Sequence, residues 1–186
     1  MKPQHLAASR RRLLRQGAHV AAAVALPLLA LPSRASVPAA RSLALSHTHT
    51  RERIDLVYAV AEDYVPEALG ALNHFLRDHY SGEVGRMHPP LFDVLHALQA
   101  TLGQSGPYEI ISAYRCPATN HKLRSTRGGG VAKESLHLQG RAIDVRLRGV
   151  PLAELRDAAL SLRAGGVGYY PDSQFVHLDT GRVRSW

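Results

Sequence analysis

The sequence predicts an α+β domain in which a small antiparallel sheet is flanked by helices. Beyond residue 50, apolar residues at helical spacing dominate first. Short alternating segments that carry polar residues follow, with one helical segment between them. The chain has 186 residues, 45% of them hydrophobic, and no internal repeat. This length and composition suit one domain with its own core.

The expected elements follow one another along the chain. Helical spacing covers residues 66–80, 91–102 and 151–163, and a further helix begins within residues 120–124. Gly103 and the pair Gly165-Gly166 can end the second and third of these helices. Strand patterns cover residues 51–58, 108–114, 142–147, 167–170 and 175–178. A glycine run at residues 128–130 predicts a loop.

The formal net charge of +8 is concentrated at the start of the chain. Residues 1–35 hold six Lys and Arg and no acidic residue, which leaves residues 36–186 with 17 basic and 15 acidic residues, a net charge of +2. A nearly neutral body gives no reason to expect nucleic acid as a partner.

The first 35 residues have the three parts of an export signal. A basic stretch precedes an apolar run over residues 17–31, and Ser33-Arg34-Ala35 is a small-x-small cleavage site. The apolar run has about 15 residues, fewer than the roughly 20 that span a bilayer, so no stable membrane anchor is expected after cleavage. The segment around Arg10-Arg11-Arg12 resembles the twin-arginine consensus. It predicts delivery to the periplasm by the twin-arginine export machinery.

Residues 36–50 are rich in Ala, Pro, Ser and Arg, and we interpret them as a linker before a domain that covers residues 51–186. His47 and His49 lie in this segment. In a short polar tract, such histidines are expected to be solvated.

Three polar residues of the second half could hold a metal ion. Asp144 lies on a predicted strand, and Gly140 could turn the preceding loop so that His137 lies beside it. His177, on another predicted strand, supplies a third donor. Two imidazoles and a carboxylate suit a catalytic zinc, which keeps three protein ligands and one open position for water. Spacing alone is a weak signal, because a hydrogen-bonded histidine beside a solvated aspartate would give the same pattern.

The surroundings of these residues strengthen the hypothesis of a single zinc site on the sheet. The pattern Ser135-x-His137-x-x-Gly140-x-Ala142-x-Asp144 with the late Val176-His177-Leu178-Asp179 resembles zinc peptidases of the D-alanyl-D-alanine carboxypeptidase, VanX, lysostaphin and hedgehog group. The segments at residues 112–120 and 166–171, Ser-Ala-Tyr-Arg-Cys-Pro-Ala-Thr-Asn and Gly-Val-Gly-Tyr-Tyr-Pro, resemble the twin-arginine-exported murein endopeptidases of the MepK type. The resemblance covers residues 45–186 and implies a zinc metallopeptidase that cleaves peptide cross-links of peptidoglycan, including those between two meso-diaminopimelate residues.

The remaining site residues are expected around the metal. Arg115 is the candidate for binding an oxyanion or a substrate carboxylate, because its guanidinium offers a fork of donors. Ser135 and Tyr114 are expected to bind substrate beside it. Asp179 is the carboxylate nearest in sequence to the last ligand, and we assign it a role either as general base or as a hydrogen-bonding partner of that ligand.

Two other functions stay open at this point. The enzyme could act as a D,D- or L,D-carboxypeptidase on stem peptides. The domain could also bind zinc and peptidoglycan without turnover, because Gln174 and Phe175 stand where some of the resembled enzymes carry a Glu or His base.

Overall fold

The computed structural model describes residues 39–126 and 131–186. The predicted export signal and the glycine loop at residues 128–130 lie outside the described residues. Within the described ranges, no helix has both the length and the apolar character needed to cross a membrane. The elements are, in chain order, β1 Ala40–His47, β2 Arg53–Val60, β3 Asp63–Tyr64, α1 Pro66–Phe75, α2 Pro90–Leu102, β4 Tyr108–Ser112, α3 Pro117–Thr126, the 3₁₀ helix η1 Leu136–Gln139, β5 Ala142–Leu147, α4 Leu152–Leu162, β6 Gly166–Tyr170, β7 Phe175–Asp179 and β8 Arg184–Ser185.

All described strands form one sheet, and the fold is α+β as predicted, but the sheet is neither small nor purely antiparallel. Its eight strands run in the order β3-β2-β1-β4-β5-β7-β6-β8. The pairs β1–β4 and β6–β8 are parallel, while the central strands β4, β5, β7 and β6 pair antiparallel. The predicted antiparallel sheet is therefore the centre of a larger mixed sheet.

The prediction of a linker over residues 36–50 is wrong for β1. Leu43, Leu45 and His47 alternate with more exposed residues and point into the interior. The third inward position is a histidine, so the sequence here resembles a polar tract more than a strand with a period of two. His47 is 1% exposed, and its Nδ1 accepts hydrogen bonds from the backbone N–H groups of His49 and Thr50. The expectation of a solvated side chain is thus wrong for His47, whereas His49 is exposed.

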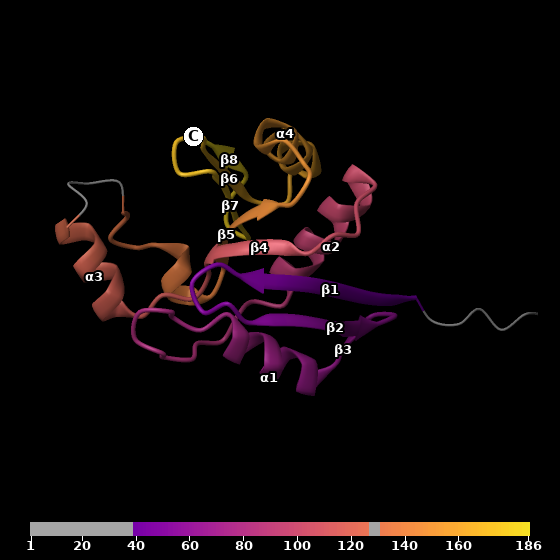
Figure 1. Ribbon diagram of the computed structural model, residues 1–186, viewed down its shortest axis with the longest axis horizontal. Helices are drawn as coiled ribbons and strands as arrows, with labels where there is room; N and C mark the ends of the chain where they lie inside the picture. Colours follow the sequence, from indigo (N-terminus) through magenta and orange to yellow (C-terminus); the bar gives the residue numbers. More distant parts are fainter. Residues whose placement is uncertain (1–38, 127–130) are drawn as a thin grey trace, which may run out of the picture. The chain divides into compact units, whose positions relative to one another are not determined.

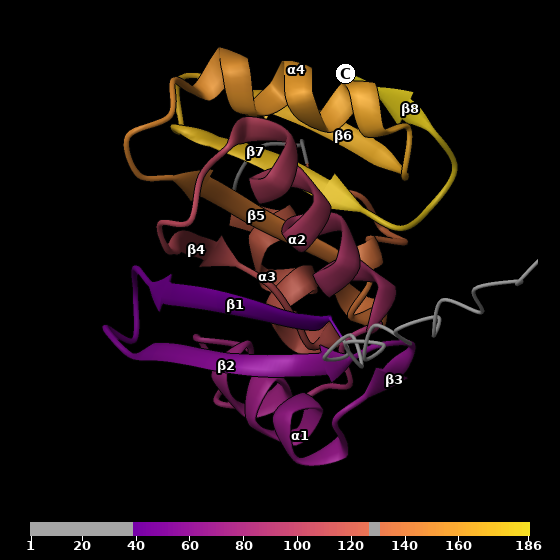
Figure 2. The same ribbon diagram turned by 90° about the vertical axis from the view of Figure 1, so that its right-hand side faces the viewer.

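The strands β5, β7 and β6 separate an apolar face from a polar one. Ile143 and Val145 of β5 and Val176 and Leu178 of β7 join the hydrophobic core. Helices α2 and α4 lie side by side over this face (Figure 2). Alternate residues of a strand point to opposite faces, so Asp144 and its neighbours in the sheet point away from these helices. Helix α3 lies on that other side (Figure 1).

The first helix is shorter than predicted: α1 ends at Phe75, whereas the helical spacing predicted an end near Tyr80. Beyond it, the buried carboxylate of Asp78 accepts hydrogen bonds from the backbone N–H of Tyr80 at 2.9 Å and of Cys116 at 2.9 Å. An aspartate that binds the backbone two residues on favours a turn over a helix. This turn also fixes the backbone next to Arg115.

Candidate metal centre

His137 is held by the tight turn of η1. Gly140 ends this turn with a φ of 63°, a conformation that favours glycine, and its N–H donates to the His137 carbonyl. A Cβ at Gly140 would lie 2.1 Å from the carbonyl oxygen of Arg86, so no other residue fits there without a shift of the backbone. The imidazole Nδ1–H of His137 donates to the carbonyl oxygen of Ala113 at 2.6 Å, which leaves the lone pair of Nε2 directed into the site.

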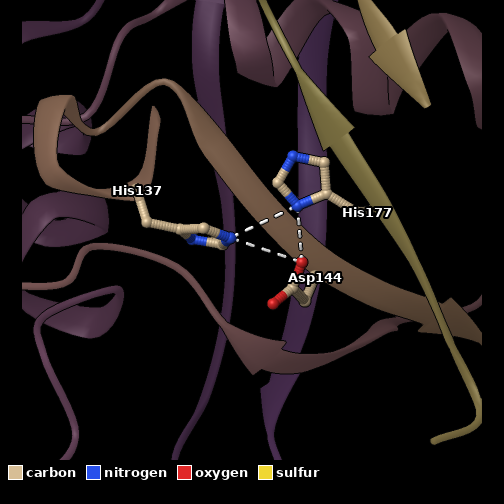
Figure 3. A group of neighbouring side chains, drawn as sticks. All are labelled: His137, Asp144 and His177. Atoms are coloured by element: carbon tan, nitrogen blue, oxygen red, sulfur yellow. Dashed lines mark hydrogen bonds and ion pairs between the residues drawn. The ribbon is translucent and has the colours of Figure 1, made fainter. Parts of the chain in front are cut away.

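Asp144 and His177 meet across the sheet. They are directly paired residues of β5 and β7, and directly opposed side chains in antiparallel strands lie about 5 Å apart. His177 Nδ1 lies 2.8 Å from Asp144 Oδ1. His137 Nε2 lies 3.4 Å from the same oxygen and 3.3 Å from His177 Nδ1 (Figure 3).

The three donor atoms suit a metal ion, and they lie within 4.8 Å of one another. His137 and Asp144 are almost fully buried. Burial lowers the pKa of His137, which favours the neutral imidazole that binds a metal. Burial alone would raise the pKa of Asp144, but hydrogen bonds with the imidazoles of His137 and His177 hold that pKa below its usual range, so the carboxylate is ionised. A neutral imidazole and a carboxylate are zinc donors.

Asp179 lies behind His177 and not in front of the metal centre. Its side chain is completely buried and accepts five hydrogen bonds. One comes from His177 Nε2 at 3.3 Å, two come from the backbone N–H groups of Gly166 and Gly181, and two come from Arg184. Burial acts to raise the pKa of Asp179, but these hydrogen bonds hold it well below its usual range. The carboxylate can fix the orientation of His177, and it has little capacity to take up a proton.

Arg115 lies beside the metal centre on the segment that follows β4. It is 9% exposed, and its Nη2 is 4.0 Å from Asp144 Oδ2 and 3.4 Å from Ser112 Oγ. Its Nη1 donates to Asn120 Oδ1 at 3.3 Å, and its backbone N–H donates to the carbonyl of His137. The guanidinium is therefore fixed at the edge of the site with its positive charge close to the carboxylate of Asp144.

A cavity of about 350 Å³ opens in front of these residues. Ser135 lines it together with Arg115 and the three metal-binding candidates. Tyr114 does not, because its hydroxyl donates to Glu83 and its ring packs on Gly85. The cavity therefore gives no support to the prediction that Tyr114 binds substrate.

Six polar or aromatic residues that line the cavity are not among the predicted site residues, namely Glu134, Tyr170, Ser173, Phe175, Arg184 and Trp186. For two of these residues, the spacing in the sequence could have indicated a place at the site. Tyr170 lies two residues beyond Gly168 on β6, and Phe175 lies two residues before His177 on β7, so each shares the polar face of the sheet with the site.

The family model for the peptidoglycan L,D-endopeptidase MepK matches residues 35–186. The chain belongs to this family. MepK of Escherichia coli K12 is 45% identical over 179 residues, which cover 96% of this chain and 97% of the relative. The probable MepK of Haemophilus influenzae is 41% identical over 152 residues, 81% of each chain. No solved structure matches the chain.

Proposed function

We propose that the protein is a zinc-dependent endopeptidase that hydrolyses L,D peptide cross-links of peptidoglycan. Membership of the MepK family makes it a metallopeptidase of the cell wall, because its relatives are named as peptidoglycan L,D-endopeptidases. The observation that carries the proposal is the group of His137, Asp144 and His177, whose donor atoms converge on the floor of an open cavity.

Zinc is the cofactor that this donor set suits. His137 Nε2, an oxygen of Asp144 and His177 Nδ1 would hold it. In such a site zinc supplies Lewis acidity, which polarises the scissile carbonyl and lowers the pKa of a water molecule. The carbonyl of Ala113 and the carboxylate of Asp179 orient the two imidazoles from behind.

The other side chains around the metal centre have separate roles in our proposal. Arg115 supplies a fixed positive charge where negative charge develops on the substrate carbonyl or where a substrate carboxylate binds. Ser135 contributes a polar group to the cavity wall. Among the described residues, the carboxylates that line the cavity are Asp144 and Glu134, and Glu134 is exposed. We assign Asp179 to the orientation of His177, since its hydrogen bonds leave it poorly suited as a base.

The substrate determines the cellular compartment in which the enzyme acts. A peptidoglycan hydrolase acts outside the cytoplasmic membrane, and the twin-arginine-like segment at residues 9–15 supports export to the periplasm in a folded state. The net charge of +2 on residues 36–186 supports no role in binding nucleic acid.

Digestion of purified sacculi, followed by separation of the muropeptides, tests the proposal. We expect the wild-type chain to convert cross-linked dimers into monomers in the presence of zinc. Asp144→Asn, which keeps the side-chain volume but removes the charged ligand, should leave the dimers intact. Shortened stem peptides with an unchanged dimer fraction would instead identify a carboxypeptidase. Unaltered muropeptides from a zinc-loaded chain would identify a domain without turnover.

A further inference from the structure

The one tryptophan of the chain, Trp186, forms a wall of the cavity beside the metal centre. The short strand β8 pairs parallel with β6 and brings the tryptophan there. The backbone N–H of Trp186 donates to the Val167 carbonyl, and its carbonyl accepts from the Tyr169 N–H. The indole ring then lies 5.3 Å from the ring of His177, between centroids, at an interplanar angle of 51°.

The indole is fixed from several directions. It rests on Gly168, the residue paired with His177 across β6 and β7, and a Cβ there would lie 2.8 Å from the ring. Its Nε1–H donates to the hydroxyl of Tyr170 at 2.7 Å. The guanidinium of Arg184 stacks 4.7 Å from the ring centroid, and Arg184 is itself held by Asp179. Through Arg184, the indole is therefore connected to Asp179, which is the buried hydrogen-bond partner of the candidate ligand His177.

Despite this fixation, Trp186 is 50% exposed. A single exposed apolar residue needs no explanation on a protein surface. Here, however, the ring is held rigid over a glycine, borders the cavity at the metal centre, and stands near a stacked pair of Tyr170 and Phe175 that lines the same cavity. A rigid aromatic face binds apolar groups with a small loss of conformational entropy.

We propose that Trp186 is a substrate-contacting residue, whose exposed indole face packs against the methylene groups of the cross-link peptide and holds the scissile bond at the metal centre. This inference rests on the proposed function for the identity of the peptide. Gly168 acts as a positioning residue, because its missing side chain gives the indole its place.

Kinetics on a purified cross-linked muropeptide dimer test this role in the full-length chain. We expect Trp186→Ala to raise KM about 10- to 100-fold, the effect of losing one large apolar contact, while kcat changes less and the zinc content stays at one per chain. The KM of Trp186→Phe should lie between the values for the wild type and for Trp186→Ala, since a smaller ring remains. Gly168→Ala should resemble Trp186→Ala. Val183→Ala is the control, because Val183 is exposed to a similar extent, at 54%, but does not line the cavity.

Tryptophan fluorescence gives a readout that does not require turnover. Because Trp186 is the only tryptophan, rapid mixing of the wild-type chain with the dimer should change its emission, even if the dimer is not cleaved. A chain that fails to cleave the dimer but shows this change would contradict the proposed function and support the contact. An unchanged emission together with an unchanged KM for Trp186→Ala would overturn the contact. Loss of zinc from the folded Trp186→Phe variant would also overturn the proposed substrate contact, because the indole would then serve only to support the metal centre.

Discussion

At the scale of single residues, the hydrogen bonds around Asp179 decide which role this carboxylate can play. Five donors surround its two oxygens, and one of them is the imidazole of His177. A general base must exchange a proton during turnover, which five hydrogen bonds to the ionised form oppose. A carboxylate that orients a metal-binding histidine keeps its charge throughout.

Asp179→Asn should therefore weaken zinc binding as well as turnover. The amide cannot accept all five hydrogen bonds, so His177 loses its fixed orientation, and we expect zinc affinity and activity each to fall about 10- to 100-fold. Zinc titration and sacculus digestion on the same preparation measure both quantities, with circular dichroism to confirm folding. A folded variant with unchanged zinc affinity and a strongly reduced kcat would instead restore Asp179 as the general base.

At the scale of elements, the geometry of the candidate metal centre depends on the turn that joins η1 to β5. Gly140 has to adopt a positive φ and has to lie against the backbone of Arg86. His137 and Asp144 stand on either side of this glycine in sequence, so the turn sets their separation in space.

Gly140→Ala should destabilise the fold more than Gly103→Ala does. Both glycines have nearly the same φ, 63° and 62°, so both variants lose about 1–2 kcal/mol from the left-handed conformation. Nothing lies near a Cβ at Gly103, whereas the clash at Gly140 adds about 1–3 kcal/mol of overpacking. Chemical denaturation of both variants measures the difference. Equal losses of unfolding free energy would show that the contact with Arg86 costs nothing.

Regular alternation of apolar and polar residues explains which strands could be predicted from the sequence. Strand β5 was predicted with its observed bounds, because Ile143 and Val145 alternate clearly with Asp144 and Arg146. The strands β3 and β8 have two residues each, which is too short for any pattern. The candidate metal ligands could be predicted because each stands in a recognisable motif, although His177 lies 40 residues beyond His137. Trp186 was not, because only the pairing of β8 with β6 brings it to the cavity.

At the scale of the whole molecule, the net charge is distributed unevenly along the chain. Six of the eight net positive charges lie before residue 36, and residues 36–186, which carry the candidate metal centre, are nearly neutral. The proposed export through the twin-arginine route, which carries folded proteins, would allow the candidate metal centre to form before transport.

Replacing Arg10-Arg11 with Lys-Lys should block export, although the net charge is unchanged. The twin-arginine route recognises the two arginines as a signal and not only their charge. Fractionation of cells that express each form, with immunodetection in the periplasmic fraction, measures the effect. Equal periplasmic accumulation of both forms would rule out this route.

The central claim is that His137, Asp144 and His177 hold one zinc ion, and anomalous X-ray diffraction at the zinc absorption edge tests it most directly. Crystals of the zinc-loaded full-length chain should show one strong anomalous peak about 2.0–2.2 Å from His137 Nε2, an oxygen of Asp144 and His177 Nδ1. Asp179 should remain outside the coordination sphere, bonded to the opposite nitrogen of His177. A peak ligated by Asp179, a peak elsewhere, or no peak after zinc addition would contradict the account.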